Sequence, residues 1–154
     1  MNTTADLLLQ CRNHAAVESL DYAGAATPAQ ALALLRAAPS VKLVDVRTNA
    51  ERDWIGKVDL PAAQHLTVQW SLYPGGTPNP DFVAQLAAQA ARDDILLFLC
   101  RSGVRSRYAA KLATQASFAN CFDILEGFEG DRDAMGHRKS VNGWCYAGLP
   151  WIGA

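Results

Sequence analysis

Three features are missing from this sequence: paired cysteines, a long apolar run, and an excess of charge of either sign. Its 154 residues include four cysteines, but no Cys-x-x-Cys pair and no Cys/His cluster with the spacing of a zinc site. We therefore expect no metal and no cofactor. No window approaches the ~20 consecutive apolar residues that a membrane-spanning helix needs. The net charge of -1 argues against a general nucleic-acid partner and gives no reason to expect a membrane partner.

The first residues also lack the pattern of a secretory signal. No Lys or Arg comes before the short apolar stretch at 7–9, and Asp6 precedes that stretch directly. We therefore expect a cytoplasmic protein. That compartment is reducing, and a chain of this length can build its own core, so we expect free thiols rather than structural disulfides. The four cysteines are Cys11, Cys100, Cys121 and Cys145.

What the sequence does contain is an alternation of helix-like and strand-like segments. Short β-branched or apolar runs predict buried strands, and Ala/Leu-rich segments with helical spacing predict helices. The first of these helices has a clear start, because Thr27 is a good N-cap and Pro28 suits the first helical position. The expected strands cover 41–46, 95–99 and 121–125, and the expected helices cover 27–38, 50–54, 81–91 and 103–115.

This alternation predicts an α/β domain with a mostly parallel central sheet and helices on both faces. We expect a single domain over 1–154, with its core at about 27–154 and with 1–26 as an N-terminal extension packed on or flanking that core. The glycine-rich, charged segment 126–143 predicts an irregular surface excursion, a flap near the strand ends. The apolar residues of 146–151 then return to the body of the domain.

Cys100 stands where the expected strand 95–99 ends, and in open α/β sheets ligands bind at the carboxyl ends of the strands. The amides at the start of the next helix, together with Arg101 and Arg105, would favour the nucleophilic thiolate form of this cysteine. The same groups would bind an anion. We therefore take Cys100 as the candidate nucleophile. The candidate substrate-binding residues are Arg101, Ser102, Gly103, Val104, Arg105 and Ser106.

Within this loop, Gly103 would let the backbone turn tightly, and Ser102 and Ser106 offer hydroxyls to an anion or as helix caps. None of the three histidines lies in the loop, and a nest of amides can activate a thiol without a general base. An inert buried cysteine is the simpler alternative. It leaves the two arginines and the glycine unexplained.

The loop CRSGVRS at 100–106 resembles the active-site loop of the rhodanese-like family, sulfurtransferases that carry sulfur as a cysteine persulfide. LVDVRTNAERDWIGKV at 43–58 resembles the family's upstream strand and turn. DILEGFEG at 123–130 and GWCYAGLPW at 143–151 are similar to its closing strand, glycine-rich turn and terminal region. Two stretches depart from the pattern. The segment after the upstream turn lacks the usual histidine, and the excursion at 129–142 is longer than the usual final turn.

The resemblance implies a rhodanese fold in which Cys100 takes sulfane sulfur from an anionic donor such as thiosulfate. The persulfide would then pass the sulfur to cyanide or to a cellular thiol, and a protein sulfur acceptor is a further candidate partner. The amides of 101–106 would cradle the sulfur, and Arg101 and Arg105 would attract the donor. We expect a monomer or a homodimer.

The resemblance also implies supporting residues outside the loop. Asp45 and Arg47 match the family's pair at a strand end, which helps to hold the loop region. An ordinary surface ion pair is the alternative for these two residues. Glu51 would support Arg47 or cap a helix. Cys145 lies near the flap and is the one other thiol that could take part, by resolving the persulfide.

Two other functions stay open. A cysteine phosphatase, or an arsenate reductase on the same fold, would carry an arginine six positions after the cysteine. That position is Ser106, with Arg105 one place early and Arg107 one place late, so the loop is one residue short for phosphate. A non-catalytic rhodanese-like module for binding or sulfur sensing would be marked by loss of the cysteine, and here the cysteine is present.

Overall fold

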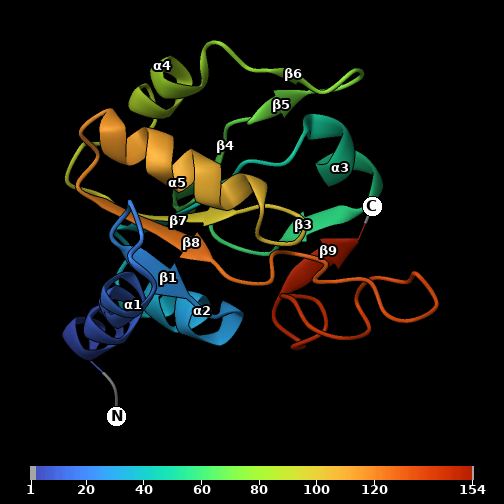
Figure 1. Cartoon of the computed structure of the whole chain (residues 1–154), viewed down its shortest axis with the longest axis horizontal. Coiled ribbons are helices and arrows are strands. Elements are labelled where there is room, and N and C mark those ends of the chain that lie inside the picture. The colour runs from blue at the N-terminus through green and yellow to red at the C-terminus, as the bar shows by residue number, and fades with distance from the viewer. Residues whose placement is uncertain (1–2, 154) are drawn as a thin grey trace.

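Five parallel strands form the central sheet of the computed structural model, which describes residues 3–153 (Figure 1). Their order across the sheet is β1–β8–β7–β2–β4, and every neighbouring pair is parallel. These strands are β1 Gly24–Ala26, β2 Val41–Asp45, β4 His65–Thr67, β7 Ile95–Leu99 and β8 Asn120–Ile124. The predicted α/β class with a parallel central sheet is confirmed.

Helices cover both faces of this sheet (Figure 1). Side chains alternate between the faces along each strand, so Leu43 belongs to the apolar cluster under α1 and α2, and Val44 to the cluster under α4 and α5. A fifth helix, α3, follows β2. The helices are α1 Thr4–Glu18, α2 Pro28–Ala37, α3 Asn49–Trp54, α4 Phe82–Ala87 and α5 Arg105–Gln115.

The helix starts that the sequence predicts depend on capping residues. At α2 the Thr27 hydroxyl accepts a hydrogen bond from the Gln30 amide at 3.1 Å, and the Gln30 side chain accepts one from the Thr27 amide at 3.0 Å. This capping box confirms the predicted N-cap. The last predicted helix begins later than expected, at Arg105, because Gly103 has a φ of 97°, which a helix cannot include. The helix expected at 81–91 ends at Ala87, because the next amides turn back onto the Leu86 carbonyl.

The N-terminal segment is integrated with the sheet. Leu7 and Cys11 of α1 are buried in the same cluster as α2. Residues 24–26, which the sequence analysis placed in the extension, form the edge strand β1 beside β8. Edge strands as short as β1 and β4 lack a clear pattern in the sequence, so neither was predicted. No helix within residues 3–153 is long and apolar enough to cross a membrane.

The C-terminal region is irregular, as predicted. Between β8 and β9 the chain forms turns and bends, and Trp144 then anchors it, fully buried, with its indole N–H donated to the Pro150 carbonyl at 2.9 Å. The chain finishes with β9, which pairs antiparallel with β3. The remaining short elements are β3 Gly56–Val58, η1 Ala62–Gln64, β5 Ser71–Leu72, β6 Thr77–Pro78 and β9 Trp151–Gly153.

Candidate active site

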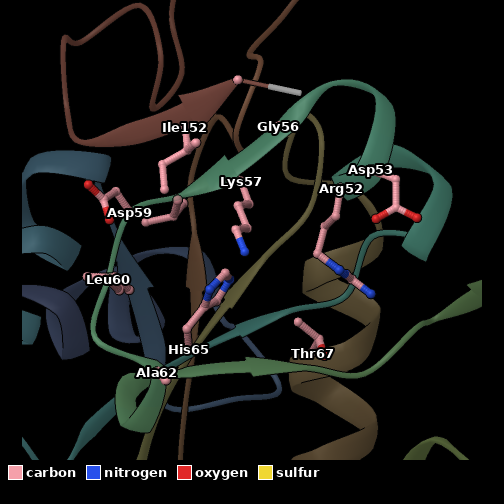
Figure 2. A pocket seen from close by; sticks show the side chains of 12 residues that line it. Arg52, Asp53, Gly56, Lys57, Asp59, Leu60, Ala62, His65, Thr67 and Ile152 are labelled. Carbon is pink, nitrogen blue, oxygen red and sulfur yellow. The ribbon is translucent and has the colours of Figure 1, made fainter.

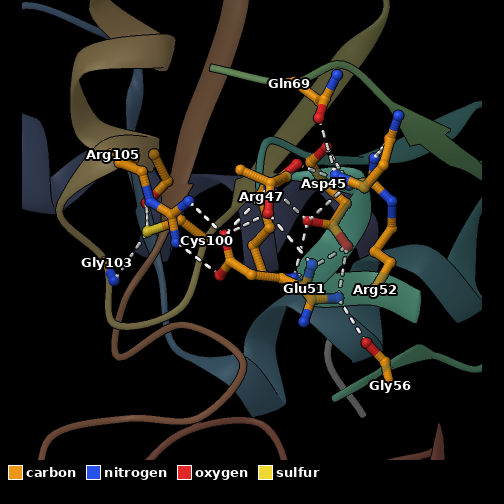
Figure 3. Close-up of polar contacts among 12 residues, drawn as sticks. Asp45, Arg47, Glu51, Arg52, Gly56, Gln69, Cys100, Gly103 and Arg105 are labelled. Atoms are coloured by element: carbon orange, nitrogen blue, oxygen red, sulfur yellow. Dashed lines mark hydrogen bonds and ion pairs between the residues drawn. The ribbon is translucent and has the colours of Figure 1, made fainter. Parts of the chain in front are cut away.

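Cys100 directly follows β7, the middle strand of the sheet, and α5 begins five residues later. The residue is buried, with 1% of its surface exposed. The Gly103 amide donates a hydrogen bond to the Cys100 Sγ at 3.1 Å (Figure 3). The positive φ of Gly103 makes this turn possible, because it directs the loop back over the sulfur. The sulfur thus lies at the carboxyl end of a strand and receives an N–H bond from its own loop.

Several other amides of this loop have no acceptor. Among the backbone hydrogen bonds of residues 3–153, none is donated by Arg101, Ser102 or Val104. No side chain caps the start of α5, so the N–H groups of its first turn also lack partners there. Free amides that converge at a helix start form a cradle for an anion.

Arg105 does not face the loop as a free cation. Its two terminal nitrogens donate to the two carboxylate oxygens of Glu51, at 2.7 and 2.9 Å (Figure 3). These hydrogen bonds raise the pKa of Arg105; burial opposes them, and the charges of Glu51 and Cys100 add to the increase. Burial alone would raise the pKa of Glu51, but Arg105 and Thr48 lower it to about 2. The sequence predicts that Glu51 supports Arg47 or caps a helix. Glu51 does cap α3, through Thr48, but its ion-pair partner is Arg105.

Asp45 and Arg47 form a buried ion pair at the end of β2. Arg47 donates to both Asp45 carboxylate oxygens, the shortest contact being 2.8 Å, and to the Gly56 carbonyl at 2.9 Å. Neither side chain is exposed, so the interpretation as a surface ion pair is wrong. The Arg47 guanidinium also lies over the Phe128 ring, at 4.3 Å from its centre. The pair therefore braces the turn that follows β8.

That turn holds the cysteine loop from the other side. The Phe128 amide donates to the Cys100 carbonyl at 2.8 Å, and the Glu129 amide donates to the Arg101 carbonyl at 2.9 Å. Gly127 lies so close that a Cβ there would come within 2.5 Å of the Arg101 carbonyl carbon. The glycine at 127 is thus required for close packing of the turn against the loop.

Ser106 and Asp123 are the polar groups beneath the sulfur. The Ser106 Oγ lies 3.3 Å from the Cys100 Sγ, and it donates to Asp123 Oδ1 at 2.5 Å. Asp123 is 1% exposed, and this burial raises its pKa to about 7, although Ser106 and the charge of Arg107 act in the opposite direction. Sequence reasoning missed Asp123. The available signal was a carboxylate in the middle of CFDIL, an otherwise apolar strand.

The remaining candidates lie further from the sulfur. Arg101 is exposed. The pKa of Arg138, in the 126–143 segment, is lowered first by burial and next by the charge of Arg101. Cys145 is partly buried, and this burial raises its pKa to about 11. No hydrogen bond among the described residues joins Cys145 to Cys100. All four cysteines are free.

A separate hollow of about 580 Å³ lies between β3 and β4 (Figure 2). Arg52, Lys57 and His65 line it, with Lys57 pointing toward His65. Cys100 is not one of its lining residues. The hollow is connected to the site only indirectly, since Arg52 contacts the buried Asp45 at 3.5 Å.

Comparisons with known proteins agree with this geometry. The sequence model of the rhodanese-like domain matches residues 27–134. An uncharacterized protein of Rickettsia rickettsii is 35% identical over 112 residues, which cover 71% of this chain and 80% of that protein.

Two solved structures resemble the fold. The crystal structure of Rv0390 from M. tuberculosis has a TM-score of 0.77 and 42% identity, over 85% of this chain and 98% of that one. The solution structure of the polysulfide-sulfur transferase homodimer from Wolinella succinogenes has a TM-score of 0.60 and 19% identity, over 96% of this chain and 88% of that one. At that identity the second likeness shows a shared fold.

Proposed function

Because this chain belongs to the rhodanese-like family, we propose that it is a sulfurtransferase in which Cys100 accepts and passes on a sulfane sulfur. The observation that carries the proposal is the Gly103 N–H donated to the Cys100 Sγ, inside a loop where the amides of 101, 102 and 104 donate no backbone hydrogen bond within residues 3–153. Such a cradle stabilises a sulfur anion and offers further donors to a second sulfur bound to the first.

The reaction we propose is a double displacement. The Cys100 thiolate attacks the outer sulfur of thiosulfate, so that a new S–S bond forms while the S–S bond of thiosulfate breaks. The electron pair of that bond leaves with sulfite, and the persulfide keeps one negative charge. Cyanide or the thiolate of an acceptor then bonds to the outer sulfur, and the electron pair of the persulfide bond returns to Cys100. A covalent intermediate of this kind gives ping-pong kinetics.

Loop geometry favours sulfur transfer over phosphatase or arsenate chemistry. A phosphatase loop needs an arginine at the sixth position after the cysteine, and that position holds Ser106, whose hydroxyl lies against the sulfur. The neighbouring Arg105 is bound by Glu51 at both terminal nitrogens. Thiosulfate and cyanide are proposed here as representative donor and acceptor, and a protein thiol is a further proposed acceptor.

The test is the intact mass of the reduced protein after thiosulfate treatment. We expect the wild type to gain one sulfur atom, and the same gain in Cys145→Ser, which removes the one thiol that is not buried. Cys100→Ser should gain none. No added sulfur in the wild type would contradict the proposal, and hydrolysis of a phosphate ester that depends on Cys100 would then support the phosphatase alternative.

A further inference from the structure

The Cys100 sulfur, the Ser106 hydroxyl and the buried Asp123 carboxylate form a chain of hydrogen bonds. We propose that Ser106 and Asp123 form a proton relay that accepts the thiol proton of Cys100. The inference rests on the proposed function only in taking Cys100 as the nucleophile. It gives the loop residue Ser106, which touches the reacting sulfur, a role in proton transfer, and it adds Asp123, which acts through Ser106.

The direction of the chain follows from counting protons. Ser106 has one hydroxyl hydrogen, and it is donated to Asp123 Oδ1, since an ionised carboxylate can only accept. The Ser106 oxygen is then an acceptor toward the Cys100 sulfur, 3.3 Å away. A thiol S–H is the only donor that Cys100 can supply. Before the proton moves, the arrangement is therefore S–H to Oγ, and O–H to carboxylate.

The position of Asp123 makes it a proton acceptor rather than a structural charge. It is the fourth of the five residues of β8, opposite Phe98 of β7 in the register, within a sheet covered on both faces. Ser106 is the one hydrogen-bond partner of its side chain among residues 3–153, and no ion pair of that part of the chain includes it. An ionised carboxylate without a bound cation is costly in such a place, and protonation relieves that cost.

Other charged and titratable groups around Asp123 are few. Arg107 of α5 acts on it by charge without a hydrogen bond, and Tyr22, which precedes β1, lines the same surface pocket as Arg107. Burial, and next the charge of Asp123, raise the pKa of Tyr22 to about 12, so that phenol stays neutral near pH 7. Asp123 itself has a pKa of about 7 because it is buried. The carboxylate can therefore take up a proton under ordinary conditions.

The transfer balances without any further reactant. The S–H bond of Cys100 breaks and its proton bonds to Ser106 Oγ, while the original hydroxyl proton of Ser106 moves to Asp123 Oδ1. One negative charge thus leaves a buried carboxylate and reaches the sulfur. There it is met by the Gly103 amide, the free loop amides and the guanidinium of Arg105. After transfer, the protonated Asp123 donates to Ser106, and the Ser106 hydroxyl donates to the thiolate.

The first test is the pH dependence of Cys100 alkylation by iodoacetamide, with the modified residue identified by mass. Because the two protons are coupled, the alkylation rate of the wild type should rise in two steps as the pH is raised. The second step should increase the rate a few-fold, because a thiolate beside an ionised carboxylate is more nucleophilic. Asp123→Asn should leave a single step in this pH profile. Its alkylation rate on the acid side should differ from that of the wild type by less than about threefold, since Asp123 is already neutral when the thiolate forms. Glu129→Gln is the matched control, because it removes another buried carboxylate next to the loop and should keep both steps.

A purely structural Ser106–Asp123 bond gives the opposite pattern. Asp123 would then stay ionised, so the wild type would show one step. Asp123→Asn would speed alkylation in acid because it removes a negative charge near the thiolate. Either result would overturn the relay. Neither depends on sulfur transfer, because sulfur loading from thiosulfate is measured separately by mass.

The second test uses the wild type alone and does not require a folded variant. After the transfer, Cys100 is a thiolate and Asp123 is protonated. Infrared spectra near pH 7 should therefore contain the carbonyl stretch of a protonated buried carboxylic acid, shifted by deuterium exchange. Alkylation of Cys100 makes the sulfur neutral, so Asp123 ionises and the band should lose intensity as the pH is raised above 7. If neutral-pH spectra show no such band, or if alkylation leaves it unchanged, the proposal fails.

Discussion

Arg105 and Glu51 form a bidentate ion pair that joins the start of α5 to α3. The two residues are 54 positions apart in the chain. The pair lies beside the Cys100 sulfur, at the edge of the anion cradle (Figure 3). One partner comes from the cysteine loop and the other from α3, the helix that follows β2. The pair therefore fixes the loop and also cancels one of its two cationic charges.

This relationship predicts a non-additive result for donor use. Arg105→Ala should raise the KM for thiosulfate, chiefly because it leaves the Glu51 carboxylate unpaired near an anionic donor. Adding Glu51→Gln to Arg105→Ala should recover most of the lost affinity, since the repelling charge is gone. Gln at position 51 keeps the capping box of α3, so the helix start is preserved. Steady-state kinetics of the two single variants and the double variant would check this, and simple additivity would contradict it.

The same pair should contribute to stability in a pH-dependent way. The pKa of Glu51 in the folded state is about 2, below its usual value near 4.5, so its contribution is complete above pH 4.5 and is lost as the pH falls toward 2. Glu51→Gln should be less stable than the wild type at pH 7, by roughly 1–3 kcal/mol. Urea unfolding at several pH values should show the two proteins converging near pH 2. A constant difference would show that the ionisation of Glu51 is not involved.

Local patterns account for the parts of the fold that were predicted. The β-branched run at 41–46 and the apolar run at 95–99 became β2 and β7, because a strand buried on both faces needs mostly apolar side chains. Thr27 became the predicted N-cap, because its hydroxyl satisfies a free amide three residues later, and Thr48 does the same at the start of α3. The position of Cys100 followed from the strand–loop–helix order alone.

Contacts between distant segments could not be predicted in the same way. Glu51 pairs with Arg105 rather than Arg47 because the fold brings Glu51 of α3 beside Arg105 at the start of α5. A local sequence pattern does not predict a contact between residues 54 positions apart. Asp123 is linked to Ser106 across 17 positions, through the parallel pairing of β7 with β8 and the return of α5. The three-residue strands β1 and β4 depend on neighbours for their conformation.

The turn at Gly127 offers a test of how the loop is held in place. Gly127→Ala should destabilise the protein and slow alkylation or sulfur loading of Cys100, because a Cβ would lie 2.5 Å from the Arg101 carbonyl carbon. Gly148→Ala is the matched control: its φ of 74° is close to the 69° of Gly127, but a Cβ there meets nothing within 4 Å. The difference between the two variants in chemical denaturation isolates the clash from the backbone strain. Equal losses would show that strain alone is responsible.

The buried pair of Asp45 and Arg47 should be among the most sensitive positions outside the loop. Asp45→Asn removes the negative charge but keeps the size, so Arg47 is left as an unpaired cation with no exposed surface. Losing one partner of a buried pair costs about 3–5 kcal/mol, which should appear as a large fall in the midpoint of urea unfolding. Asp21→Asn is the control, because its partner Lys111 and Asp21 itself are 48% and 67% exposed and such pairs contribute less than about 1 kcal/mol.

Since Arg47 braces Phe128, and the Phe128 amide holds the Cys100 carbonyl, Asp45→Asn should also reduce sulfur loading at temperatures where the variant is still folded. A variant that unfolds early but loads sulfur at the wild-type rate would limit the pair to stability.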